Sequence, residues 1–191
     1  MPFLIALVVL VGVLCVLDLL LTLGVIRRLR VHGEMLAARP AAQPEPMLAA
    51  GGTARPFSAV TVDGVPLSDT SLADPTLLGV FSTGCPACVE RLPLFVERAR
   101  AFPGGRDHVV AVVVGPEDAA AEDVRELRPV AHVVVEDHGG AVARAFRVTG
   151  FPSFALVGGA ADGAADGAAK VLASGTLLED LGDLDAVAAR R

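Results

Sequence analysis

The residues best suited to chemistry are two cysteines, Cys85 and Cys88, in the stretch FSTGCPACVERLPLF at positions 81–95. Only two residues separate them, so the pair is a candidate redox couple, half of a metal site, or two buried small side chains. The third cysteine, Cys15, lies in a long apolar run. Cysteine packs there as a small hydrophobe, and we expect Cys15 to be inert.

A strand followed by a helix would position this pair. The run TLLGVFST (76–83) is short enough for a buried strand, and the apolar residues from Cys88 to Phe102 follow helical spacing. Pro86 then occupies the first helical position, where its missing N–H costs nothing. Unpaired N–H groups and a partial positive charge at a helix N-terminus favour a thiolate. We therefore expect Cys85 to be the exposed attacking sulfur and Cys88, one turn later, the buried resolving sulfur.

Zinc binding and inert packing are the alternatives for the pair. Structural zinc takes about four ligands, and one Cys-x-x-Cys supplies two of them. His108, His132 and His138 could add ligands, but they stand at predicted strand starts and in a loop, without finger-like spacing. The spacing therefore favours a redox pair.

The remaining pattern predicts a small α/β domain. The stretch 57–68, FSAVTVDGVPLS, alternates around an Asp-Gly turn and predicts a hairpin. Strands alternating with helices imply a parallel portion with right-handed crossovers, and the last two strands an antiparallel pair. The result is a central mixed sheet flanked by helices. The further strands are expected at 108–115, 132–137, 153–158 and 170–175, and the further helices at 117–128, 140–147 and 178–190.

Two motifs resemble the thioredoxin superfamily, most closely its membrane-anchored TlpA/ResA-like thiol-disulfide reductases. They are GCPACVERLP at 84–93 and FRVTGFPSF at 146–154, and the resemblance extends over about residues 55–190. It implies a thioredoxin-like fold and a thiol-disulfide oxidoreductase. By this resemblance Cys85 attacks, Cys88 resolves the mixed disulfide, and Pro93 kinks the active-site helix.

The resemblance also implies where a substrate would lie. Pro152, in a cis bond to Phe151, would lie against the cysteines and line the groove in which the substrate backbone pairs, with Gly150 giving the turn into it. The groove residues implied in this way are Gly84, Pro86, Ala87, Phe151 and Pro152. The implied partners are protein thiols or disulfides and a membrane-bound or soluble dithiol electron donor. No organic cofactor and no metal are implied.

The chain departs from the family pattern at two positions. Gly84 stands where the family often has tryptophan, and the chain contains no Trp or Tyr at all. Gly79 stands where thioredoxins proper have a buried acid on the strand. The proton leaving Cys88 would then need another acceptor, such as water or Glu90, although we expect Glu90 to be a solvated helix residue.

Three other functions are compatible with the pattern. Anchored copper-delivery proteins of the Sco type use two cysteines and a distant histidine, here His132 or His138, but their cysteines are spaced by three residues. A peroxiredoxin-like thiol peroxidase is suggested by Ser82, three residues before Cys85, although Leu78 replaces that family's proline. A non-catalytic module that uses the same fold as a partner platform is the third.

The first residues predict a membrane anchor. Residues 3–26 are almost uninterruptedly apolar, and a helix of that length spans the roughly 30 Å hydrocarbon core. No basic side chain precedes the run, and it is too long for a cleavable signal peptide, so we expect residues 1–26 to remain as an anchor. Asp18 inside it costs about 2.5–3.5 kcal/mol, and we expect it to be protonated or to reach water; pairing with a partner helix is the alternative.

A basic juxtamembrane segment and a Pro/Ala-rich linker, residues 27–52, lead to a domain predicted at 53–191. Residues 27–38 could lie on the lipid surface or form a solvated helix end. The prolines and glycines of 39–56 predict a semi-rigid tether. From residue 53 onward 12 Lys and Arg face 19 Asp and Glu, and so acidic a domain has no footprint for nucleic acid.

Two arguments give opposite answers for the side of the membrane on which the domain lies. Arg27, Arg28 and Arg30 follow the apolar run and no basic residue precedes it, which by the positive-inside rule places the domain in the cytoplasm. The family resemblance implies the extracytoplasmic side, where disulfides form. We expect the extracytoplasmic side, with a reductase acting in cytochrome or other exported-protein maturation.

Overall fold

The computed structural model describes residue 12, residues 45–158 and residues 168–182. The predicted transmembrane segment 3–26 and the basic segment 27–38 lie outside the described residues, apart from Gly12, which is helical. In the described part of the chain, no helix is both long and apolar enough to cross a bilayer. The compact unit that carries the cysteines begins at Pro44.

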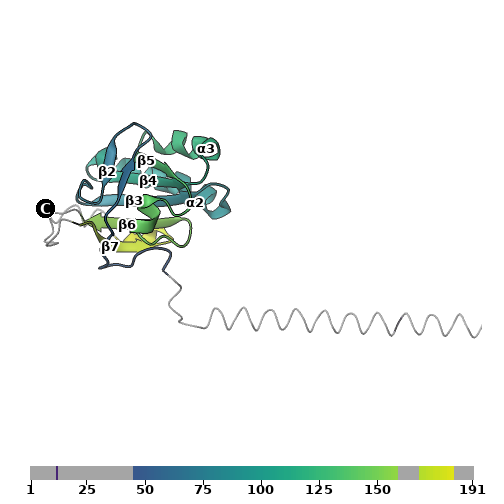
Figure 1. The fold of residues 1–191 in the computed structure, drawn as a ribbon. Coiled ribbons are helices and arrows are strands. Elements are labelled where there is room, and N and C mark those ends of the chain that lie inside the picture. The colour runs from purple at the N-terminus through teal and green to yellow at the C-terminus, as the bar shows by residue number, and fades with distance from the viewer. Residues whose placement is uncertain (1–11, 13–44, 159–167, 183–191) are drawn as a thin grey trace, which may run out of the picture. The chain divides into compact units, whose positions relative to one another are not determined.

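Five strands form the central sheet in the order β5-β4-β3-β6-β7 (Figure 1). The parallel strands are β3 (Thr76–Ser82), β4 (Val109–Val114) and β5 (His132–Glu136). The antiparallel strands are β6 (Ser153–Gly158) and β7 (Lys170–Gly175). The predicted mixed sheet is confirmed. Because β6 runs antiparallel to β3, the start of β6 lies beside the end of β3, with Val80 paired to Ser153.

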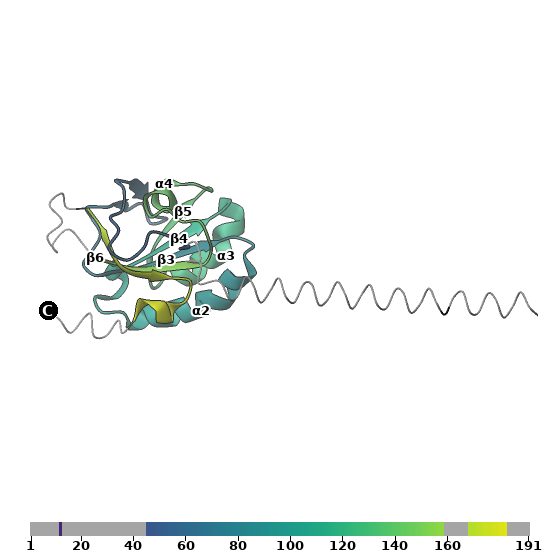
Figure 2. The same ribbon diagram turned by 90° about the horizontal axis from the view of Figure 1, so that it is seen from below.

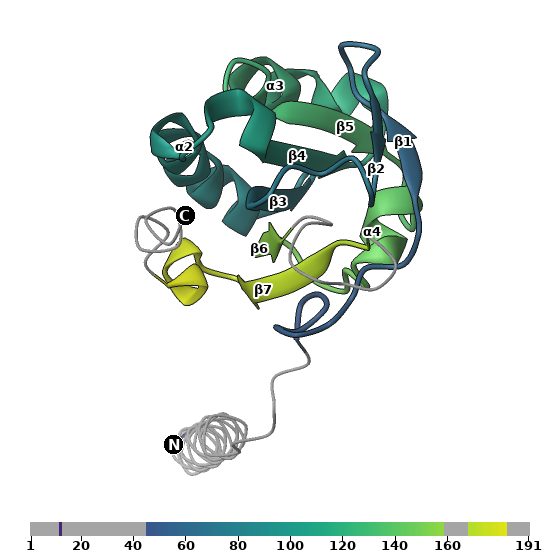
Figure 3. The ribbon, with the colours of Figure 1, turned by 90° about the vertical axis from the view of Figure 1, so that its left-hand side faces the viewer.

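Helices and a hairpin cover the two faces of this sheet (Figures 2 and 3). One face carries α2 (Pro86–Ala101) and α3 (Glu117–Leu127). The other carries α4 (Ala141–Ala145) and the predicted hairpin of β1 (Ser58–Val60) and β2 (Pro66–Ser68). Short 3-10 turns are formed by η1 (Gly105–His108) and η2 (Leu178–Leu181). Of the helix expected at 178–190, the structure has only the η2 turn, and residues 183–191 lie outside the described part.

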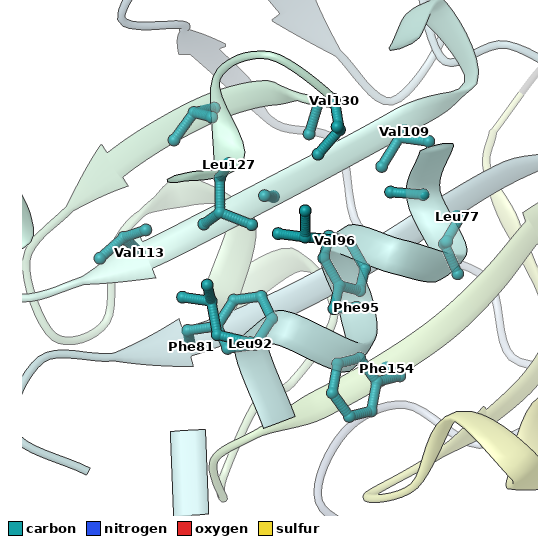
Figure 4. Close-up of a cluster of buried hydrophobic side chains, with 14 of the residues drawn as sticks. Leu77, Phe81, Leu92, Phe95, Val96, Val109, Val113, Leu127, Val130 and Phe154 are labelled. Carbon is teal, nitrogen blue, oxygen red and sulfur yellow. The ribbon is translucent and has the colours of Figure 1, made fainter. Parts of the chain in front are cut away.

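Three phenylalanines join α2 to the sheet (Figure 4). The rings of Phe81 on β3, Phe95 on α2 and Phe154 on β6 are fully buried. Phe95 meets Phe81 edge-on at 5.3 Å between ring centroids and stacks on Phe154 at 5.9 Å. Each such ring stabilises the fold by about 1.5–3 kcal/mol relative to an exposed one. The middle of α2 is therefore held against β3 and β6.

The compact unit begins earlier than the boundary predicted at Thr53. The side chain of Met47 is only 2% exposed, and the N–H of Leu48 donates to the carbonyl of Phe146 at 2.7 Å. Gly51 and Gly52 exchange backbone hydrogen bonds with Val171 on β7. The tether predicted over residues 39–56 includes this stretch, because its prolines and glycines give no apolar period. In the structure, residues 45–52 pack on the domain through Met47, the half-buried Leu48 and backbone hydrogen bonds.

Candidate functional site

The first wall of the site is the thiol turn, residues Gly84–Cys88, between the end of β3 and the start of α2. Gly84 has φ of +73°, a left-handed conformation that glycine adopts without strain. Cys85 is the N-cap residue, and Pro86 follows at the first helical position, as predicted. The N–H of Cys88 donates to the Sγ of Cys85 at 3.3 Å. A helix N-terminus thus gives the first sulfur a backbone donor.

The two cysteines differ in exposure as predicted. Cys85 is partly exposed, whereas Cys88 is 3% exposed and belongs to the core cluster between α2 and the sheet. Burial, and next the hydrogen bond with Cys85, raises the pKa of the Cys88 thiol to about 12. Cys88 is consequently a neutral thiol near pH 7. It can become a nucleophile only when a base removes its proton.

The second wall is the proline loop, residues Thr149–Ser153, which leads into β6. The peptide bond between Phe151 and Pro152 is cis, as the family resemblance implied. The Sγ–H of Cys85 donates to the carbonyl of Phe151 at 3.8 Å, which joins the two walls directly. The Oγ of Ser153 lies 2.5 Å from the carbonyl of Gly150 and closes the loop on itself. The turn at Gly150 is thus held by a buried hydroxyl.

Exposed residues surround the partly exposed sulfur. Gly84, Pro86 and Ala87 are all exposed, and Phe151 is half-buried. Val89, one residue after Cys88, is 69% exposed and adds an apolar side chain to the surface of α2. The surface around the thiol turn is apolar and uncharged at these positions, and the residues nearest to Cys85 in the turn are small.

The absence of an acid at position 79 has a steric cause. A Cβ built on Gly79 would lie 2.6 Å from Cε2 of Phe95, so the ring of Phe95 fills the volume that a side chain on β3 would need. Glu90 is exposed, as expected for a solvated helix residue. Neither position provides a buried acid for the proton of Cys88.

A carboxylate that the sequence did not indicate acts on Cys88 from another helix. Asp123 on α3 is half-buried, and its negative charge is one cause of the raised pKa of Cys88. Burial first, and then the charges of Glu126 and Glu122, raises the pKa of Asp123 itself. The spacing of Asp123 from the cysteines in the sequence does not indicate this effect. It arises because α3 packs on the same face of the sheet as α2, where the charge of Asp123 acts on Cys88.

The histidines considered as metal ligands each have another partner. His132 starts β5, at the end of the sheet away from the cysteines, and its Nε2 lies 3.2 Å from Asp107. His108 is hydrogen-bonded to the carbonyl of Pro75. His138 packs its ring edge-on against Phe151, with centroids 6.4 Å apart. In the described ranges, no three His, Cys, Asp or Glu side chains are grouped so that they could hold a metal ion.

The fold matches solved structures, although no family model and no curated protein matches the sequence. The thioredoxin domain of a thiol-disulfide oxidoreductase from Bacteroides vulgatus superposes with a TM-score of 0.55 at 19% identity, covering 74% of this chain and 97% of that one. A thiol-disulfide oxidoreductase from Bacteroides fragilis gives 0.52 at 14% identity, with 68% and 94% covered. A thio-disulfide isomerase from Thermus thermophilus gives 0.51 at 18% identity, with 68% and 87% covered. The chain therefore has a thioredoxin-like fold.

Proposed function

We propose that this chain is a membrane-tethered thiol-disulfide oxidoreductase that exchanges its Cys85–Cys88 pair with protein substrates. One observation carries the proposal above the others. The partly exposed sulfur of Cys85, at the N-terminus of α2, accepts a hydrogen bond from the backbone N–H of the buried Cys88. On its other side it donates to the carbonyl of Phe151, the residue before the cis-proline. The names of the structural neighbours are in accord with this chemistry.

The reaction balances as a two-electron exchange. The thiolate of Cys85 attacks one sulfur of a substrate disulfide, which forms a mixed disulfide and releases the other substrate sulfur as a thiolate that takes up a proton. Cys88 loses its proton and attacks the Sγ of Cys85, which frees the second substrate thiol and leaves a Cys85–Cys88 disulfide. The substrate is reduced, the protein is oxidised, and a dithiol donor must reduce it again.

The burial of Cys88 determines which cysteine attacks the substrate first and which resolves the mixed disulfide. While Cys88 remains a thiol of raised pKa it does not compete for the incoming disulfide, and Cys85 is the sulfur that a substrate meets. The resolving step then needs proton removal from Cys88, which makes that step sensitive to nearby charge.

Variants of the two cysteines test the activity. In the Cys88→Ser full chain, a model protein disulfide such as insulin should accumulate as a mixed disulfide on Cys85, visible as added mass that dithiothreitol removes. In the Cys85→Ser chain, turnover should fall by at least about 10³-fold, since the attacking group is lost. Cys15→Ser serves as the matched control and should keep full activity. A Cys85→Ser chain that still reduces insulin would refute the proposal.

Direction, anchoring and side of the membrane form the finer part of the proposal. We place the anchor at residues 3–26, the redox domain on the extracytoplasmic side, and the reaction in the direction of reduction, in cytochrome or other exported-protein maturation. The resemblance to TlpA/ResA-like reductases supports these assignments, and the arginines at 27, 28 and 30 oppose the side.

Labelling of intact cells tests that finer part. A Cys15→Ser chain is exposed to a membrane-impermeant maleimide before and after reductant, with a parallel acid-trapped sample. Labelling in intact cells would support the extracytoplasmic side, and trapped thiols there would support a reductase. Labelling only after lysis would place the domain in the cytoplasm, and a trapped extracytoplasmic disulfide would indicate an oxidant.

A further inference from the structure

The proline loop takes its outer hydrogen bonds from a segment near the start of the compact unit, residues 45–48, called the strap here. The N–H groups of Thr149 and Gly150 both donate to the carbonyl of Pro46, at 2.8 and 3.2 Å. The hydroxyl of Thr149 donates to the carbonyl of Glu45 at 3.2 Å, across 104 positions of sequence. The Oγ of Ser153 lies 3.4 Å from the Pro46 carbonyl. The strap therefore contacts both ends of the loop.

The strap is itself fixed to the body of the domain. Met47 is buried in the cluster that also contains Phe146 and the half-buried Val148, directly before the proline loop. The N–H of Leu48 donates to the carbonyl of Phe146 at 2.7 Å. Backbone hydrogen bonds to β7 follow within a few residues, from Gly51. Because the residues that directly follow Pro46 are fixed to the domain in this way, the strap can hold the loop in place.

The proline loop thus has two differently engaged sides. Its backbone N–H groups at Thr149 and Gly150 are used by the strap, while the carbonyl of Phe151 is directed to Cys85. If the strap were loosened, the loop would lose the acceptors of its Thr149 and Gly150 N–H groups and keep the contact of Ser153 with Gly150, the packing of Phe151 and the weak hydrogen bond from Cys85. The distance of Phe151 and Pro152 from Cys85 would then vary, without any change in the thiol turn.

We propose that the strap is a positioning element for polypeptide substrates: Pro46 and Met47 fix the proline loop at the spacing from Cys85 that an extended chain around a substrate cysteine requires. The inference rests on the proposed function. It assigns no part in sulfur chemistry to the strap, because none of its residues contacts Cys85 or Cys88 in the hydrogen bonds described. Its loss should consequently affect large substrates and spare small ones.

The test compares two substrates on the full chain carrying Met47→Ala, with Leu72→Ala as the matched control. Leu72 is buried in the same hydrophobic cluster but lies outside the strap, whose Pro46 and Glu45 carbonyls accept the hydrogen bonds of the proline loop. With insulin, Met47→Ala should raise KM by about fivefold, because the strap loses its buried side chain and the Pro46 carbonyl no longer holds the loop at a fixed position. With the small disulfide 5,5′-dithiobis(2-nitrobenzoic acid), the rate should stay within about twofold of the parent. Leu72→Ala should leave both unchanged.

A second measurement keeps the inference testable whatever the activity. Amide hydrogen exchange at Thr149 and Gly150 should be slow in the parent and at least about tenfold faster in Met47→Ala, because the strap protects these groups. The milder Thr149→Val substitution, which removes only the hydroxyl contact with Glu45, replaces Met47→Ala if that chain does not fold. Equal losses with insulin and the small disulfide, or unchanged exchange at both amides, would overturn the positioning role. A parent chain inactive on both substrates would refute the proposed function instead, and the exchange experiment would still decide whether the strap holds the loop.

Discussion

The thiol turn and the proline loop face each other across one hydrogen bond, yet different parts of the chain hold them. The thiol turn is positioned by its neighbours in sequence: the strand before it, the left-handed Gly84, and Pro86 at the start of α2. The proline loop is positioned by Pro46, far away in sequence. A site can thus combine one wall that local sequence dictates with another that only the tertiary structure explains.

This difference suggests how each wall should respond to substitution. Changes under α2 should affect the stability of the whole domain, because the thiol turn is continuous with the core. Changes around the proline loop should act more locally, through a few hydrogen bonds. Four substitutions test this contrast, beginning with the one of largest expected effect.

Phe95→Ala removes the ring that joins α2 to β3 and β6. Because Phe95 is fully buried between Phe81 and Phe154, we expect a loss of about 3–5 kcal/mol in the free energy of unfolding, measured by urea denaturation. The exposed neighbour Leu94 provides the control, since Leu94→Ala should change stability by no more than about 0.5 kcal/mol. Similar values for the two variants would contradict the role of the core in supporting the thiol turn.

Ser153→Ala acts on the proline loop and on its contact with the strap, and leaves the thiol turn untouched. The substitution deprives the carbonyl of Gly150 of its hydroxyl donor, and we expect a cost of about 2 kcal/mol. Ser58→Ala on exposed β1 should be neutral by comparison. Amide exchange should quicken around residues 149–153 and stay unchanged in α2. Faster exchange throughout α2 would show that the two walls are not independently held.

Gly84→Ala tests the local determination of the thiol turn. No atom lies within 4 Å of the added Cβ, so any loss comes from the backbone at φ +73° and should be about 1 kcal/mol. Gly84→Asn should lose less, because asparagine adopts left-handed conformations more readily. Thermal unfolding measures both losses in stability. Equal losses for the alanine and asparagine variants would contradict a cause in the left-handed backbone and would indicate a lost contact instead.

Asp123→Asn is the smallest change and tests the electrostatic influence of α3 on Cys88. Its charge raises the pKa of Cys88, so the variant should lower that pKa, seen as alkylation of Cys88 at less alkaline pH. The pKa of Asp123 is itself raised in the folded chain, so its contribution to stability is largest below about pH 3.8 and is lost as the pH rises through the folded value. The asparagine variant should therefore be slightly more stable than the parent at neutral pH and lose that advantage in acid. If the pH dependence of Cys88 alkylation were unchanged, the charge of Asp123 would have no influence on the pKa of Cys88.

Much of the thiol turn could be read from the sequence. A short apolar run followed by Cys-Pro-x-Cys predicts a strand, a helix start and an exposed first sulfur, and all three are present. The cis bond at Pro152 came from resemblance to a family, because no local pattern distinguishes it. The second cis bond, between Asp74 and Pro75, was not foreseen for the same reason.

The contacts that sequence reasoning missed share a physical origin. Pro46 acts through its backbone carbonyl, which any residue possesses, and Met47 stands in a stretch without apolar period. Asp123 acts through space from a second helix. Such roles depend on which segments pack together in the folded domain. The residue pattern within one segment does not predict its packing partners.

Gly79 and Phe95 form a coupled pair, since the ring on α2 occupies the volume next to the bare backbone of β3. An acid at position 79 would collide with that ring, so it would be destabilising when introduced by itself. A smaller residue at position 95 would open the space and reduce that cost, because the effects of substitutions at contacting positions are not additive. An acid at position 79 together with a smaller residue at position 95 should therefore destabilise the domain less than the acid alone. A design that places a proton acceptor for Cys88 at position 79 must alter both residues.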